Sequence, residues 1–304
     1  MLLATPQNPT SLIKYPNAPK RTKQLASLPC AYSPTPVSRP TSALPLEIYA
    51  YILDFADPST LASAARVNFT FQHEAEILLY RNVRICGHKC AVTCGRSLLL
   101  AKRKHRLIAL RRFQVTAACH SFHHPDLVSS IKSILNAAPN LIDLELELWG
   151  SGPLSPDEPI RLQRFTTDHD FDHNMLDFLA RVPLLKTLSI VEPPQFSILD
   201  SSIVPMLESI EGTWAVVKLV VPHRPIREVI VLGQLEEEMV EILLSALEES
   251  SARIEHLGLS VSCESANVLS ALAQRLPFLR TIEIQSVELI PSVRSTYVFT
   301  SKLQ

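Results

Sequence analysis

Glycine is scarce in this chain, at only 7 of 304 residues. None of the glycines falls into a G-x-x-x-x-G-K or G-x-G-x-x-G pattern, so the sequence has no glycine-rich loop that could cradle a phosphate group. The G-x-S-x-G turn of many hydrolases and the H-E-x-x-H helix of zinc proteases are missing as well. These absences argue against nucleotide chemistry and against the commonest hydrolases.

Long apolar runs, excess charge and regularly spaced cysteines are also missing. No stretch approaches the ~18 consecutive apolar residues of a membrane-spanning helix. The net charge of −1 is too close to neutral to suggest bulk binding of nucleic acid. The six cysteines are spread unevenly, unlike a disulfide framework. We therefore expect no membrane partner, no nucleic-acid partner and a cytoplasmic or nuclear location.

The first 43 residues differ in composition from the rest. They contain eight prolines, five lysines or arginines and no acidic residue. A segment with so little apolar periodicity cannot bury enough surface to fold. We predict a disordered, proline-rich tail over residues 1–43.

A helical pattern begins after this tail, in the stretch SALPLEIYAYILDFADPSTLA. Ser42 could cap a helix, Pro45 suits its first turn, and Asp57-Pro58 ends it. Apolar residues fall on two neighbouring faces: one stripe contains Tyr49 and Leu53, and a second contains Ile48, Ile52 and Phe55. One stripe suffices for packing in a small domain, so the second stripe indicates a partner or an unusually deep burial.

A repeated unit, apolar-x-x-apolar-x-apolar, follows from about residue 110. It begins at Leu110, Leu141, Leu185, Leu207, Ile226, Ile254 and Leu279. The first positions lie 31, 44, 22, 19, 28 and 25 residues apart, which are periods typical of stacked repeats with one long insertion at 149–175. The last two apolar positions would face one side of a parallel strand, with a helix before most units packed on that side.

The predicted fold class is therefore α/β, with four segments. These are the tail at 1–43, a compact all-α domain of three helices at 44–85, a helical linker at 86–109 and an irregular α/β repeat solenoid at 110–304. About forty residues are marginal for an independent core, so we expect the three helices to be stabilised by packing against the following residues or a partner.

The stretch LPLEIYAYILDFADPSTLASAARVNFTFQHEAEILLYRNVRI resembles an F-box, and the repeats resemble those of F-box proteins with leucine-rich repeats. The resemblance implies that the F-box binds the Skp adaptor of a cullin-RING ubiquitin ligase while the repeats hold a protein substrate. The positions that match adaptor-facing or later apolar positions of the motif are Leu44, Pro45, Ile48, Ile52, Leu61 and Val67.

The function expected from this resemblance is that of a non-enzymatic substrate receptor, with no catalytic residue, no cofactor and no metal of its own. An interaction scaffold with no role in ubiquitin transfer is the alternative. A remoter one is a metal-dependent enzyme that uses Asp168, His169, Asp172 and His173, whose like residues lie four apart as on one face of a helix.

A cysteine cluster and a basic run can be explained without a functional site. Cys86, Cys90 and Cys94 with His88 could suggest zinc, but no second pair follows, and small apolar residues on a helix fit as well. The basic run from Lys102 to Arg112 contains no interleaved aromatic residue, so we expect a solvated helix face there.

Overall fold

The computed structural model describes residues 45–116, 125–148, 154–261, 265–286 and 295–299, which belong to one compact unit. The predicted tail at 1–43 lies outside the described residues. The fold is α/β, as predicted. Its helices are α1 (Leu46–Asp54), α2 (Pro58–Ala64), α3 (Phe69–Leu79), α4 (His88–Leu98), α5 (Lys104–Ala109), α6 (Pro125–Ala137), α7 (His173–Ala180), α8 (Trp214–Val220), α9 (Glu237–Glu248) and α10 (Ser265–Arg275), with a 3-10 turn, η1, at Ala101–Arg103.

The strands form one sheet whose order follows the chain from β1 to β10. They are β1 (Asn82–Cys86), β2 (Arg112–Thr116), β3 (Asp143–Glu147), β4 (Arg164–Thr167), β5 (Thr187–Ile190), β6 (Ser209–Thr213), β7 (Glu228–Leu235), β8 (His256–Val261), β9 (Thr281–Ser286) and β10 (Ser295–Phe299). Strands β1 to β9 run parallel, and β10 returns antiparallel to β9.

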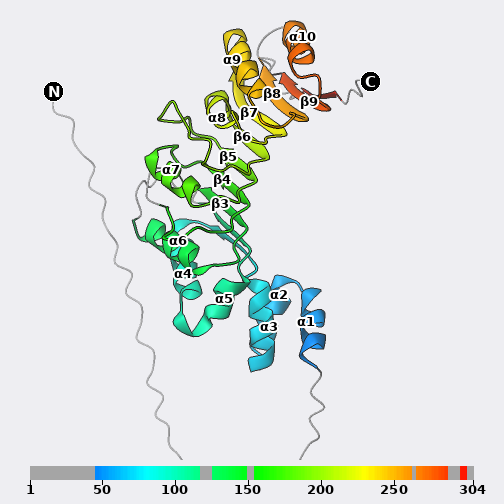
Figure 1. Cartoon of the computed structure of the whole chain (residues 1–304). Helices are drawn as coiled ribbons and strands as arrows, with labels where there is room; N and C mark the ends of the chain where they lie inside the picture. Colours follow the sequence, from blue (N-terminus) through cyan, green and yellow to red (C-terminus); the bar gives the residue numbers. More distant parts are fainter. Residues whose placement is uncertain (1–44, 117–124, 149–153, 262–264, 287–294, 300–304) are drawn as a thin grey trace, which may run out of the picture. The chain divides into compact units, whose positions relative to one another are not determined.

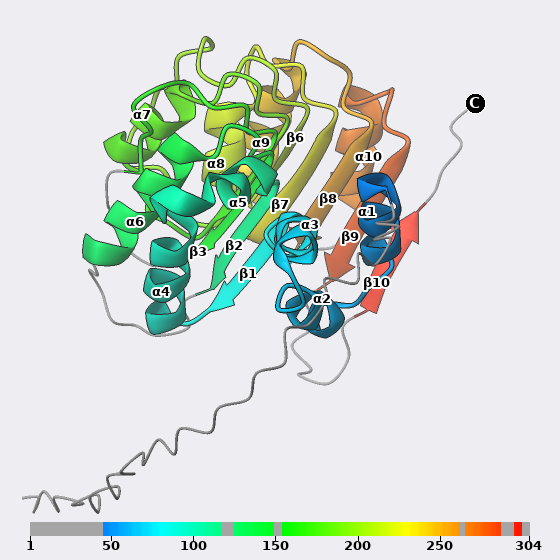
Figure 2. The ribbon, with the colours of Figure 1, turned by 90° about the horizontal axis from the view of Figure 1, so that it is seen from below.

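The helices that connect the strands, α4 and α6 to α10, cover a single face of the sheet (Figure 1). Turning the view shows the same one-sided arrangement, with the strands stacked in chain order (Figure 2). Alternate strand residues point into this layer, such as Phe113 and Val115 on β2 and Leu144 and Leu146 on β3, all at most 1 % exposed. The other face of the sheet carries no connecting helix among the described residues.

The sheet contains one strand that the sequence pattern missed. The stretch 149–175, interpreted as an insertion, contains β4, which pairs with β3 and β5 in register. Leu162 and Phe165 occupy the first two positions of the repeated unit, and Thr167 the third. Thr167 is 1 % exposed, and its hydroxyl donates to the Leu146 carbonyl at 3.1 Å. This hydrogen bond makes a polar residue acceptable at a core position.

β1 begins the sheet directly after the three helices. The sequence grouped its residues Val83 and Ile85 with the helical domain, and the structure pairs them with Phe113 and Val115 of β2. Both side chains are buried in the large core between the sheet and its helices. Residues 88–109 are largely helical, as α4, η1 and α5.

Candidate functional site

Helices α1, α2 and α3 form a small unit with a core of its own. Its buried members are Leu53, Leu61 and Ala75, and Tyr49 packs edge-on against Phe71 with ring centroids 4.8 Å apart. Asp57 caps α2, because its carboxylate accepts from the backbone N–H groups of Ser59 and Thr60 at 2.9 and 3.2 Å. Hydrogen bonds from the Ser59 and Thr60 hydroxyl groups, together with these two from the backbone, lower the pKa of Asp57.

The two apolar stripes of α1 have different surroundings. Leu53, on the first stripe, is 3 % exposed and packs inside the unit. Ile48, Ile52 and Phe55, on the second stripe, are 42, 53 and 75 % exposed. The first stripe therefore packs inside the unit, and the second is not deeply buried within the described chain.

The six residues carried over from the family motif do not share one environment. Pro45, Ile48, Ile52 and Val67 are exposed, whereas Leu61 is 6 % exposed inside the small core. Leu44 lies outside the described residues. Leu61 therefore holds α2 in place and offers almost no surface of its own.

Two exposed aromatic residues of the three-helix unit were missed. Tyr51 is 66 % exposed, and its ring meets that of Phe55 edge-on with centroids 5.1 Å apart. Phe69, at the start of α3, is 84 % exposed. A helical wheel would have placed Tyr51 beside Phe55, because residues four apart are neighbours on a helix. We call the exposed group Ile48, Tyr51, Ile52, Phe55, Val67 and Phe69 the apolar face.

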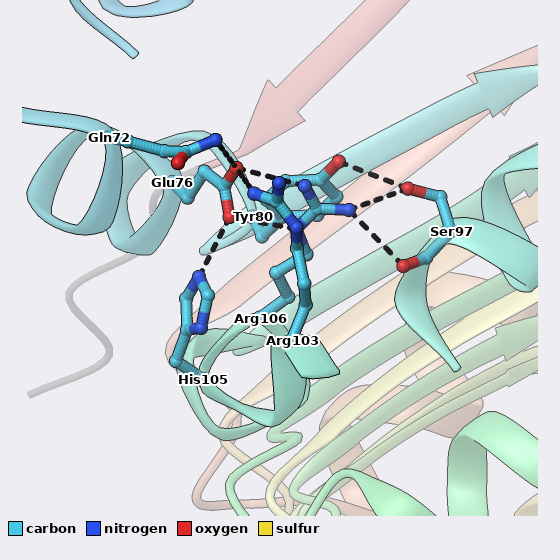
Figure 3. A network of polar contacts seen from close by, with 7 residues as sticks. All are labelled: Gln72, Glu76, Tyr80, Ser97, Arg103, His105 and Arg106. Carbon is cyan, nitrogen blue, oxygen red and sulfur yellow. Dashed lines mark hydrogen bonds and ion pairs between the residues drawn. The ribbon is translucent and has the colours of Figure 1, made fainter. Parts of the chain in front are cut away.

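A buried carboxylate lies at the opposite end of this unit, on α3. Glu76 accepts two hydrogen bonds from Arg106, from Nε and Nη2, both at 2.9 Å (Figure 3). Arg103 and His105 also bind it, the latter at 2.7 Å from Nε2, and Gln72 donates to it at 3.2 Å. Arg103, His105 and Arg106 come from η1 and α5, so this carboxylate joins the three-helix unit to the segment that leads into the sheet.

The same network continues to α4. The Nη1 atom of Arg106 donates to the carbonyl and the hydroxyl of Ser97 at 3.2 and 2.7 Å, and its guanidinium lies 4.5 Å from the Tyr80 ring centroid. Burial raises the pKa of the Glu76 carboxyl, but the hydrogen bonds from Arg106, Arg103 and His105 outweigh burial and lower that pKa to about 2. Glu76 is therefore ionised at neutral pH, with its charge fully paired. We call this network the Glu76 junction.

The Glu76 junction corrects one sequence-based expectation. The basic run was expected to form a solvated helix face, yet Arg106 is 8 % exposed and three members of the run bind one carboxylate. Arg112 is engaged as well, at 2.7 Å from Asp143. The sequence could not reveal these pairs because Glu76 lies some thirty residues from its partners.

The open face of the sheet is polar where β3 crosses it. Asp143, Glu145 and Glu147 alternate with the buried leucines, so all three carboxylates are on this side. Arg112 and Arg164 lie within 3.7 Å of Asp143, whereas burial and the neighbouring Glu147 raise the pKa of Glu145. This side of the sheet therefore presents charged and polar side chains to whatever contacts it.

The His/Asp cluster does not form the arrangement that the spacing suggested. Helix α7 begins only at His173, and Asp172 caps it by accepting from the Met175 N–H at 3.0 Å. His169 precedes the helix, is 3 % exposed and contacts the Leu148 carbonyl through Nδ1 at 3.3 Å. His169 and His173 therefore do not share a helix face.

The described residues hold no group of three or more His, Cys, Asp or Glu arranged for a metal ion. Cys86 and Cys90 are exposed and Cys94 is half-buried. None of the described helices combines the length and the apolar character that crossing a bilayer requires. The sequence matches no model of a known protein family and no curated protein.

Proposed function

We propose that this protein is the substrate receptor of a cullin-RING ubiquitin ligase. In this proposal α1, α2 and α3 form an F-box that docks on the Skp adaptor, and the strand–helix array is a degenerate leucine-rich-repeat solenoid that holds a protein substrate. Ubiquitin transfer is left to other subunits, so the chain itself needs no catalytic residue and no cofactor.

The observation that carries the proposal is the apolar face. Six large apolar side chains are exposed between Ile48 and Phe69, three of them on α1 and one on α3, which is costly unless another protein covers them. Full burial of a side chain such as Ile52 stabilises by roughly 1.5–3 kcal/mol. A nanomolar complex needs about 12 kcal/mol after the entropy of association is met, so several of the six must act together.

The array supports the second half of the proposal. Strands stacked in chain order with helices on one side leave a continuous sheet face for a substrate. The alternation of Asp143, Glu145 and Glu147 with buried leucines puts polar side chains on that face. A polar surface of this kind suits reversible recognition of a protein segment.

The proposal is tested by purifying the full chain together with a Skp adaptor and following the complex by size-exclusion chromatography. We expect Ile52→Lys and Ile48→Lys to abolish the complex, because a lysine buried in an apolar interface leaves an unpaired charge. Ile108→Lys on α5 is the matched control, since Ile108 is 54 % exposed and Ile52 53 %. All three positions are exposed, so the fold should tolerate each lysine.

A one-to-one complex that survives in Ile108→Lys and is lost in the two α1 variants supports the receptor. Separate elution of the wild-type chain and the adaptor would overturn it. A complex that forms but never promotes ubiquitination or turnover of any bound protein would favour the scaffold instead.

A further inference from the structure

We propose that the groove which receives α1 carries lysine or arginine side chains along one border, opposite Glu47 and Asp54. The inference rests on the proposed function, because the partner named here is the Skp adaptor. It adds the chemistry of the partner's rim, which the apolar face alone does not specify.

The geometry of α1 places both carboxylates on one border of the apolar face. Glu47 and Asp54 lie seven residues apart, about two helical turns, so their side chains leave the helix in nearly the same direction some 10 Å apart. On the helical wheel Tyr51 comes next, followed by Phe55, Ile48 and Ile52. An acidic edge therefore runs along the Tyr51 side of the apolar stripe.

Neither carboxylate is paired with a cation among the described residues. Both residues are exposed, and neither forms an ion pair with a described residue. The twenty-one residues from Pro45 to Ala65 contain a third acid, Asp57, and no lysine, arginine or histidine. Asp57 is occupied with capping α2, and the exposed Arg66 follows this stretch beside Val67, so Glu47 and Asp54 are the acidic charges that α1 itself presents.

A protein that covers the apolar face must bring its own rim close to these two charges. An acidic rim would be repelled, and a neutral one would remove water from the carboxylates without replacing its hydrogen bonds. A basic rim pairs with them and also attracts the partner during the encounter. Rim charges act mainly on the association rate, so the rate constant kon is the quantity to measure.

The test measures kon between the full chain and a purified, fluorescently labelled Skp adaptor by stopped flow. The salt concentration runs from about 20 mM to about 500 mM NaCl, which shortens the range of charge interactions several-fold. We expect kon of the wild type to fall with salt, and E47K/D54K to lower kon about tenfold or more at low salt. E47Q/D54N only removes the two charges, so it should lower kon less than E47K/D54K and is less disruptive to the fold.

The matched control is E238K/E249K, which changes the net charge equally at two exposed residues of α9 and its end. A control rate within about twofold of wild type, beside a slowed E47K/D54K, supports the basic rim. If the adaptor binds but kon is independent of salt and equal in both double variants, or rises in E47K/D54K, the rim inference is overturned and the receptor stands. If the wild-type chain does not bind the adaptor, both proposals are overturned.

Discussion

Glu76 is a buried carboxylate whose ionised state depends on two arginines and a histidine. Taking a charge out of water is costly, and a buried ion pair repays that cost only with good geometry. The bidentate contact with Arg106 and the additional contacts with Arg103 and His105 provide this geometry for Glu76. Removing the carboxylate would therefore lower the free energy of unfolding by more than the ion pair contributes to it, because Arg106 would remain buried without its counter-charge.

The Glu76 junction predicts a specific loss of stability in acid. The pKa of Glu76 is about 2 in the folded chain and 4.5 as a free side chain, so between these values the folded state binds fewer protons than the unfolded state. The contribution of Glu76 to the free energy of unfolding is therefore fully present above pH 4.5 and is lost as the pH falls through 2. The free energy of unfolding, measured with urea, should drop by roughly 3 kcal/mol from this group over that range.

The comparison that checks this prediction is Glu76→Gln against Glu74→Gln. We expect Glu76→Gln to cost roughly 3–5 kcal/mol at pH 7 and to approach the wild type as the pH falls towards 2. Glu74 is on the same helix and has no ion pair with a described residue, so its variant should follow the wild type throughout. Equal acid profiles for wild type and Glu76→Gln would contradict the role given to Glu76.

Arg224 is a second buried cation, and no sequence pattern pointed to it. It is 1 % exposed and donates to the backbone carbonyls of Asp200, Ile203, Val220 and Pro222 at 2.6–3.1 Å. Burial lowers its pKa to about 10. These hydrogen bonds fasten the segment between β5 and β6, where no helix covers the sheet among the described residues. An arginine that only satisfies main-chain groups leaves no periodic signal in the sequence.

At the scale of single elements, apolar spacing predicted most of the array because each strand repeats the same requirement. Strands β2, β3, β5, β6, β7, β8 and β9 were found from their apolar triplets. The helix expected before most of them is present as α6, α7, α9 and α10. β4 was missed because Thr167 replaces an apolar residue and satisfies its hydroxyl locally. The two faces of α1 were predictable for the same reason as the strands, and Tyr51 could have been added from its spacing.

Gly212 stands at the third apolar position of the repeated unit that begins at Leu207, and the structure explains why a glycine stands there. A Cβ atom at this position would lie 2.7 Å from the Ile190 carbonyl and 3.0 Å from a Val216 methyl group. The close approach arises because α8 begins two residues later, at Trp214, and turns back onto the strand. The position therefore belongs to the core, although glycine contributes no apolar side chain.

We predict that Gly212→Ala lowers the free energy of unfolding by about 1–3 kcal/mol, because the backbone of β5 or α8 must shift. Gly258→Ala is the control: its Cβ would lie 3.5 Å from Ile230, an ordinary contact. Thermal unfolding of both variants distinguishes the two cases. A Gly212→Ala midpoint equal to that of Gly258→Ala would show that the close approach relaxes without cost.

At the scale of the whole molecule, the three-helix unit depends on the rest of the chain. Its fully buried apolar core consists of Leu53, Leu61 and Ala75, whereas the array has a far larger one. A segment of about forty residues with so small a core is marginal on its own. Because the arginine partners of Glu76 lie outside the unit, excision also removes the ion pairs that hold α3.

We predict that a fragment spanning residues 44–86 is largely unfolded in isolation. Far-ultraviolet circular dichroism should show little helix, and backbone amides of α3 should exchange at nearly the rate of an unfolded peptide. The same amides in the full chain should be protected, because Glu76 is held there by η1 and α5. A cooperative thermal transition in the fragment would refute this dependence.

The order of the sheet also bears on how the chain is made. Each strand from β2 to β9 is hydrogen-bonded to the strand before it and the strand after it along the chain. Ribosomes deliver about 5–20 residues per second, so a new strand emerges every few seconds, while local structure forms in microseconds. β2 can therefore settle on β1 before β3 has been synthesised, and the growing protein extends its sheet from a finished edge without waiting for its last residue.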